Sequence, residues 1–149
     1  MKLNIKSLAN VDRGFPVLAE QVLFAQLTAE VKQKKTGDGQ NLEIDCRILD
    51  EELTKKDGST IDNSKGKMSF KYFVSLQATD KYDPDKSLAM IADAIGLPKD
   101  ADLHLEDITG KYVKIKLGIR AANDQRDEQN VVKSLMPIRA EDNFTAPEV

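Results

Sequence analysis

Two segments in which inward and outward side chains alternate strictly flank a glycine-rich turn at residues 35–40. Every second residue is apolar from Leu23 to Val31 before the turn, and from Leu42 to Ile48 after it. Such alternation predicts half-buried strands, because successive side chains leave opposite faces of a pleated backbone. The Gly-Asp-Gly sequence of the turn suits a tight reversal, because glycine readily adopts positive φ. The sequence therefore predicts a long β-hairpin. Its predicted strands are residues 19–34 and 41–50.

Three further strands and one helix are predicted after the hairpin. The period of two returns in segments 68–76, 112–120 and 131–136. Before the second of these segments, apolar residues recur at helical spacing from Leu88 to Ile95. Asp83 and Pro84 favour a helix start, and Gly96 favours its end. The predicted fold is mainly β: a five-stranded, partly open OB-fold-like barrel with one α-helix between strands 3 and 4.

The 149 residues are enough for one domain with a hydrophobic core. Flanking and inserted segments differ from the domain in their patterning. We predict an N-terminal arm (1–16), the OB-fold domain (17–138) and a flexible C-terminal tail (139–149). Within the domain, residues 51–67 are charged and rich in glycine and serine, which predicts an exposed loop or a small hairpin around Asp57-Gly58.

Composition favours a binding protein over an enzyme. The chain has one cysteine, Cys46, and one histidine, His104. Cys46 falls on the predicted inward face, where a thiol usually acts as a small buried apolar group. The potential metal ligands near His104 in sequence are Asp102, Glu106 and Asp107, and this pattern is not that of a tetrahedral metal site. The sequence contains no phosphate-binding loop, dinucleotide fingerprint or nucleophile elbow. We therefore expect no catalytic residues, no metal and no cofactor.

The sequence also lacks the features of a membrane or secreted protein. No run approaches the ~18 apolar residues that a membrane span needs, and the first residues carry no apolar signal region. A lone cysteine gives no internal disulfide. We therefore expect a cytoplasmic protein. The formal net charge of −3 argues against a uniformly basic surface but is compatible with a local basic groove.

Several segments, in this order, resemble a known family. They are Ala29-Glu30-Val31-Lys32, Lys35-Thr36-Gly37-Asp38-Gly39-Gln40-Asn41-Leu42, Ile91-Ala92-Asp93-Ala94-Ile95-Gly96-Leu97 and Gly110-Lys111-Tyr112-Val113-Lys114-Ile115-Lys116. The chain resembles the small phage-encoded single-stranded DNA-binding proteins of OB-fold type, formerly a phage domain of unknown function, over residues 15–138. It departs from that family at residues 51–67, where a long charged insertion replaces a short Gly-Lys link.

The resemblance implies a function in phage DNA replication or recombination, in the cytoplasm of a bacterial host. The implied ligand is single-stranded DNA, bound with little sequence preference, and single-stranded RNA offers the same chemistry. The acidic and aromatic residues of the tail, Glu141, Asp142 and Phe144, resemble tails that recruit replication or recombination proteins. A plain disordered end is the alternative, and a homo-oligomer is compatible with the sequence.

Proteins that bind single strands combine a cationic track for the phosphates with aromatic faces on which the bases stack. The candidate binding residues are chosen for these two features. On an OB barrel this surface is the outer side of strands two and three with the adjoining loops. The candidates are Lys32, Lys34, Lys35, Arg47, Lys71, Phe73, Tyr112, Lys114, Lys116 and Arg120.

Each group of candidates has a second interpretation. Phe73 beside Lys71 forms a stacking platform, unless the arm or the long loop covers the ring. The fourth predicted strand, with Lys114 and Lys116, is a phosphate track or an ordinary solvated face. Lysines at the hairpin tip bind the backbone of a nucleic acid or keep the edge of a strand soluble. The outward acids Glu43 and Asp45 disfavour phosphate and support the alternative function, an OB-like protein–protein interaction module.

Overall fold

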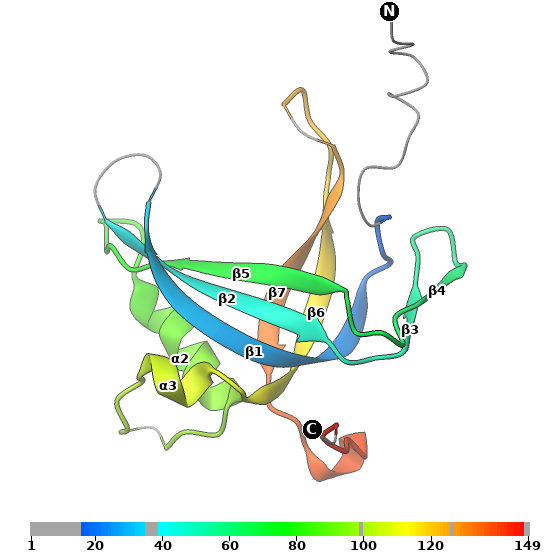
Figure 1. Cartoon of the computed structure of the whole chain (residues 1–149). Coiled ribbons are helices and arrows are strands. Elements are labelled where there is room, and N and C mark those ends of the chain that lie inside the picture. Colours follow the sequence, from blue (N-terminus) through cyan, green and yellow to red (C-terminus); the bar gives the residue numbers. More distant parts are fainter. Residues whose placement is uncertain (1–15, 35–38, 99, 126, 148–149) are drawn as a thin grey trace, which may run out of the picture.

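The computed structural model describes residues 16–34, 39–98, 100–125 and 127–147, and it is mainly β (Figure 1). Its strands are β1 (Gln21–Gln33), β2 (Gln40–Ile48), β3 (Glu52–Thr54), β4 (Thr60–Asp62), β5 (Ser69–Ser75), β6 (Tyr112–Arg120) and β7 (Gln129–Met136). Its helices are α2 (Pro84–Ala94), α3 (Leu105–Ile108) and the 3-10 turn η1 (Ala140–Asp142). The predicted arm, residues 1–16, lies outside the described residues except for Pro16.

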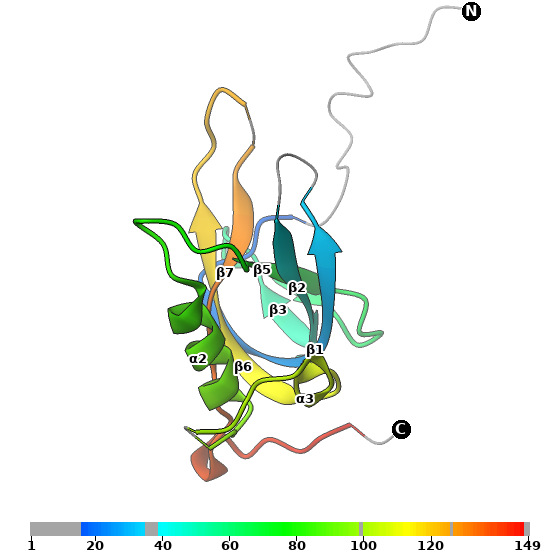
Figure 2. The same cartoon turned by 90° about the vertical axis from the view of Figure 1, so that its left-hand side faces the viewer.

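Strand β1 pairs on both of its sides. Its residues 25–33 pair antiparallel with β2, and its residues 21–26 pair antiparallel with β6. β5 extends the sheet beyond β2 and β7 extends it beyond β6, which gives the order β5-β2-β1-β6-β7. β1 curves strongly along its length, so the five-stranded sheet wraps around its own inner face (Figure 2).

The structure agrees with the mainly β prediction and differs from the predicted details in two respects. Within the part of the chain that the structure describes, no hydrogen-bonded ladder joins the edge strands β5 and β7, although the two strands approach one another. The observed architecture is therefore a curved five-stranded antiparallel sheet. The helix α2 follows the fifth strand instead of the third, and a second short helix, α3, precedes β6. The third predicted strand is therefore β5, because the two short strands β3 and β4 precede it.

These two strands, β3 and β4, form a hairpin within residues 51–67, in agreement with the second of the two interpretations of this segment. Gly58 turns the chain with φ 90°, and the Asp57 carboxylate accepts a hydrogen bond of 2.9 Å from the backbone N–H of Ser59. Leu53 is fully buried and fixes the hairpin to the core. Strands of three residues are too short for alternation to reveal them.

The apolar positions of the alternating segments form the core, as predicted. Leu27, Ile44 and Ile115 have no exposed surface, and they come from β1, β2 and β6. Cys46 lies among them, and burial raises the pKa of its thiol to about 12. A thiol with this pKa stays protonated at neutral pH, so Cys46 behaves as an apolar core residue.

Helix α2 begins and ends at the predicted signals. The Asp83 side chain accepts a hydrogen bond of 2.9 Å from the backbone N–H of Asp85, and Pro84 occupies the first turn. Gly96 follows the helix with φ 82°. Ile91 is fully buried, and α2 contacts both edge strands, β5 and β7. The helix therefore packs where the sheet remains open.

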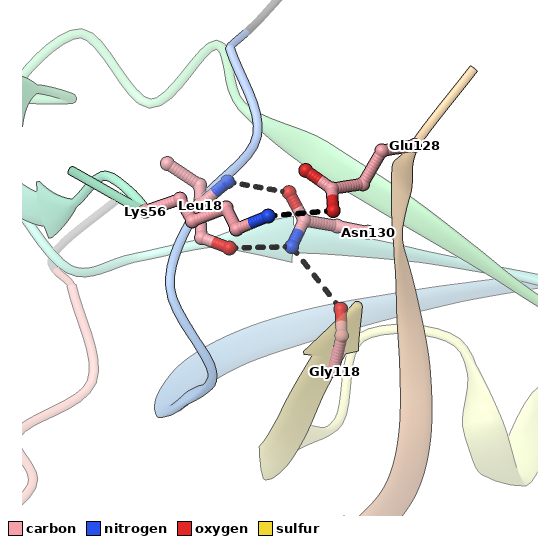
Figure 3. A network of polar contacts seen from close by, with 5 residues as sticks. All are labelled: Leu18, Lys56, Gly118, Glu128 and Asn130. Atoms are coloured by element: carbon pink, nitrogen blue, oxygen red, sulfur yellow. Dashed lines mark hydrogen bonds and ion pairs between the residues drawn. The ribbon is translucent and has the colours of Figure 1, made fainter. Parts of the chain in front are cut away.

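An asparagine on β7 fixes the segment that leads into β1 (Figure 3). The Asn130 side-chain amide donates hydrogen bonds to the carbonyls of Leu18 (2.8 Å) and Gly118 (3.1 Å). Its side-chain carbonyl accepts a bond of 2.7 Å from the backbone N–H of Leu18. Beside it, Lys56 and Glu128 form an ion pair of 2.6 Å. The Asn130 contacts tie the first described residues to β6 and β7, and the ion pair joins the turn of the β3–β4 hairpin to the residue before β7.

A second asparagine, Asn63, joins the β3–β4 hairpin to the main sheet. Its side chain is buried and donates to the carbonyls of Ile48 (3.1 Å) and Asp50 (2.9 Å). It also accepts a hydrogen bond of 3.1 Å from the backbone N–H of Met68. One side chain thus satisfies backbone groups at the end of β2 and before β5.

We expect Asn63→Ala to lower the free energy of unfolding by about 2–3 kcal/mol, because it removes three hydrogen bonds and leaves buried backbone groups unpaired. Urea denaturation of both proteins measures this difference. Thr60→Ala, at an exposed position of the same hairpin, is the control and should change stability by less than about 0.5 kcal/mol. Equal stability of the two variants would contradict the structural importance of Asn63.

Candidate nucleic-acid interface

The outer face of the sheet carries most of the predicted binding residues. On β2 the side chains of Glu43 and Arg47 alternate with the buried ones, and on β5 Phe73 does the same with Val74. Pairing places Glu43 directly opposite Phe73 and places Arg47 opposite Ser69. The register therefore brings outward residues from separate parts of the sequence onto one surface.

At the hairpin end of this surface lies a groove of about 490 Å³, which we call the hairpin groove. Its lining residues are Lys32, Gln33, Lys34, Asn41, Glu43, Lys71 and Phe73. The Phe73 ring is 57% exposed, so within the described residues neither the β3–β4 hairpin nor another segment covers it. The Lys34 ammonium donates a hydrogen bond of 2.7 Å to the hydroxyl of Ser75, which directs this lysine toward β5.

The hairpin groove contains charges of both signs. The Glu43 carboxylate lies 2.5 Å from the Lys71 ammonium and 3.3 Å from the Lys32 ammonium. The hydrogen bond from Lys71, with the nearby charge of Lys32, lowers the pKa of Glu43, and the same contact raises the pKa of Lys71. Glu43 therefore stays ionised and holds both lysines. With Lys34, three cations face one anion, and the groove retains net positive charge.

A second aromatic site lies farther along the outer face, where the C-terminal segment packs on β1 and β6. The Phe144 ring stacks on Phe24 with 4.8 Å between centroids, and its centroid lies 5.5 Å from that of Tyr112. Asp142 forms an ion pair of 3.0 Å with Lys114. We call this set the tail patch. The segment predicted as a flexible tail thus contacts the sheet through two side chains.

The two sites are connected by side-chain hydrogen bonds. The Arg47 guanidinium donates to the side-chain carbonyl of Gln26 at 3.0 Å. The Gln26 amide in turn lies 3.4 Å from the Tyr112 hydroxyl. Arg47 therefore lies between the hairpin groove and the tail patch, on the same face as both.

The structure divides the predicted binding residues into groups. Lys32, Lys34, Lys71 and Phe73 come together in the hairpin groove. Tyr112 and Lys114 contact the C-terminal segment, and only 18% of the Lys114 side chain is exposed. Lys116 is exposed beyond them, and Arg120 lies at the end of β6, past a register shift after Lys116. Lys35 lies outside the described residues.

The contributions of Phe24, Phe144 and Glu43 to this surface were not predicted from the sequence. Phe24 occupies an outward position of β1, between the buried Leu23 and Ala25. An aromatic residue at an outward position is a usable signal for the tail patch. The partner, Phe144, is 120 residues away in sequence (144 − 24), so no local pattern connects them. Glu43 argues against phosphate binding when the sequence is read alone, because the sequence does not reveal its two lysine partners on other strands.

Other kinds of site receive no support from the described residues. No three His, Cys, Asp or Glu side chains gather there in a way that could hold a metal ion. None of the helices in that part of the chain has the length and apolar character of a membrane span. No protein-family model matches the sequence, and no curated protein matches it either. The resemblance to phage single-strand-binding proteins therefore stays a prediction.

We expect Phe144→Ala to release the C-terminal segment, because the ring supplies its aromatic contacts with the sheet. Amide hydrogen exchange should then accelerate at residues 139–147 and stay slow in β1 and β6. Thr145→Ala, at an exposed neighbouring position, serves as the control and should leave exchange unchanged. Unaltered protection of 139–147 in Phe144→Ala would show that other contacts hold this segment.

Proposed function

We propose that this protein binds single-stranded nucleic acid, and single-stranded DNA in particular, along the outer face of its sheet. Lys32, Lys34 and Lys71 contact phosphates, and Phe73 stacks a base. Binding is largely independent of sequence, because phosphates carry no base information and every base has a face that can stack. Single-stranded RNA offers the same two features and is a second ligand of the same class.

One observation carries the proposal: Phe73 is 57% exposed on a strand, beside lysines, in a groove of about 490 Å³. An aromatic face next to cations is the arrangement that binds unpaired bases and their phosphates. Exposure of a large ring to water has a free-energy cost. A ligand that stacks on the ring removes that cost.

We also propose that the curved sheet is an OB-fold-like, partly open barrel. In support, β1 pairs with both β2 and β6, β5 continues from β2, and β7 continues from β6. The helix α2 precedes β6 and contacts both edge strands. On such a barrel, the outer side of β2 and β5 with the β1–β2 loop is the usual surface for oligonucleotides. The hairpin groove occupies that position.

The cellular context that we propose is phage DNA replication or recombination in the bacterial cytoplasm. It rests on the resemblance of four ordered sequence segments, from Ala29 to Lys116, to phage proteins of this kind. In this context the C-terminal segment recruits partner proteins after it leaves the sheet, which its Phe144 and Asp142 contact in this structure. Release of this segment would make both side chains available to a partner.

A protein–protein interaction module is the second candidate. The acids Glu43 and Asp45 lie on the outer face, and an acidic-aromatic segment of the chain itself packs on β1 and β6. This face can therefore bind peptide-like groups. The two candidates differ in their response to salt and to oligonucleotides.

The test is a fluorescence-anisotropy titration of labelled oligo-dT of about 12 nucleotides. We expect binding at about 50 mM salt and a steep loss of affinity by about 200 mM, because lysines that neutralise phosphates release counterions. Duplex DNA of equal length should bind more weakly, because its bases are not free to stack. Failure to bind oligo-dT at low salt would favour the protein-interaction candidate.

The hairpin groove should dominate this affinity. We expect Lys34→Gln with Lys71→Gln to weaken oligo-dT binding and to reduce the slope of log affinity against log salt by about 0.7 for each phosphate that a lysine no longer neutralises. The control is Lys65→Gln with Lys86→Gln, which makes the same charge change at two exposed lysines outside the groove. Equally weakened binding in the two double variants would mean that only net charge matters.

A further inference from the structure

The anion in the hairpin groove suggests more than phosphate binding. We propose that the groove prefers guanine at one position, where Phe73 stacks the base and Glu43 binds its Watson–Crick edge. This inference rests on the proposed binding of single strands. It adds a base preference at one subsite of a surface that otherwise tolerates any sequence.

Glu43 lies where the edge of a stacked base would point. Glu43 and Phe73 are directly paired residues of β2 and β5. Side chains in such pairs have Cβ atoms about 4.5–5.5 Å apart. Phe73 is 57% exposed, whereas the Glu43 side chain is 12% exposed. The ring therefore rises from the groove and the carboxylate lies at its floor. A base stacked on the β2 side of the ring places its edge over Glu43.

The carboxylate is held in place but keeps acceptor capacity. Its Oε1 contacts Lys71 at 2.5 Å, and its Oε2 contacts Lys32 at 3.3 Å. An ionised carboxylate offers about four acceptor positions, so each oxygen can still accept another hydrogen bond. Each ammonium has three donors and retains some of them. The groove floor thus presents an acceptor pair with a donor on either side.

Guanine has the complementary edge. Its N1–H and N2–H donors are adjacent and can bind both oxygens of one carboxylate in charge-assisted hydrogen bonds. Its O6 acceptor lies next to N1–H, where a lysine ammonium can donate to it. Adenine and cytosine each offer one donor group beside an acceptor, and thymine offers one N–H between two acceptors. A carboxylate paired with one of these bases would face an acceptor at its second oxygen.

The same edge is free only in an unpaired base. In a duplex, the Watson–Crick edge of guanine is bonded to cytosine, and a single strand leaves it available. Glu43 thus favours single strands over duplexes for a reason separate from stacking. The simpler possibility, that Glu43 only neutralises Lys32 and Lys71, predicts no preference among bases and is one outcome of the test.

The experiment compares three labelled oligonucleotides of about 12 nucleotides by anisotropy at low salt: oligo-dT, the same strand with one central guanine, and the same strand with inosine there. We expect the guanine strand to bind about five- to tenfold more tightly than oligo-dT. Inosine keeps N1–H and O6 but lacks the N2 amino group, so its strand should lie between the two. A single guanine per strand avoids four-stranded structures.

Glu43→Gln is the decisive variant. Glutamine has nearly the same shape but offers one acceptor, and it no longer holds Lys32 and Lys71. We expect oligo-dT affinity to rise and the guanine preference to disappear. Glu30→Gln is the matched control: Glu30 pairs with Glu43 across the β1–β2 ladder, lies 3.7 Å from Lys32 and has a side chain that is 66% exposed. This control should raise affinity and keep the preference.

The outcomes separate this inference from the proposed function. Equal binding of all three strands by the unsubstituted protein overturns the guanine subsite and leaves single-strand binding intact. A preference that persists in Glu43→Gln overturns the role of Glu43. Absence of binding to any strand overturns both the subsite and the proposed function. Thermal unfolding of each variant verifies that the fold is retained.

Discussion

The pairing of β1 on both sides is the constraint on which the rest of the structure depends. Because β2 and β6 both follow the register of β1, its alternation decides which residues of three strands enter the core. The same alternation places Phe24 and Lys32 on the outer face, about 26 Å apart along the strand (8 residues at about 3.3 Å). The tail patch and the hairpin groove are therefore at opposite ends of one strand.

The sequence predicted the elements with a strong period and missed those that depend on distant partners. The long hairpin, the strands near 68–76 and 112–120, and α2 with its caps were predictable, since alternation, Asp83-Pro84 and Gly96 are local signals. Whether the sheet closes into a barrel was not predictable, because closure depends on how far β1 curves and on whether β5 and β7 form a hydrogen-bonded ladder. For the site, outward position was predictable. The contacts between distant residues were not predictable, and the stacking of Phe144 on Phe24 is an example.

The outer face shows how an acidic strand is compatible with the binding of phosphates that we propose. In the sequence, Glu43 and Asp45 appear unfavourable for phosphate binding. The alternation of one strand does not reveal which residues of the other strands lie beside them. In the folded chain, Glu43 is held by two lysines, and its pKa is lowered by them. An anion in this position separates like charges that would otherwise repel one another in a small groove. It also fixes the two ammonium groups where a ligand can reach them.

The contrast between the two aromatic sites bears on what binds the open one. Phe24 and Tyr112 are covered by a ring from the same chain, whereas Phe73 stays 57% exposed. An apolar protein surface that covered Phe73 would remove water from Lys32, Glu43 and Lys71 without replacing their hydrogen bonds, and this desolvation is costly. A nucleotide bound as we propose would avoid that cost, because its base would cover the ring while its phosphate and base edge would bind the charged groups. The groove is thus less suited to an apolar partner than to a ligand that is both flat and charged, such as the nucleotide that we propose.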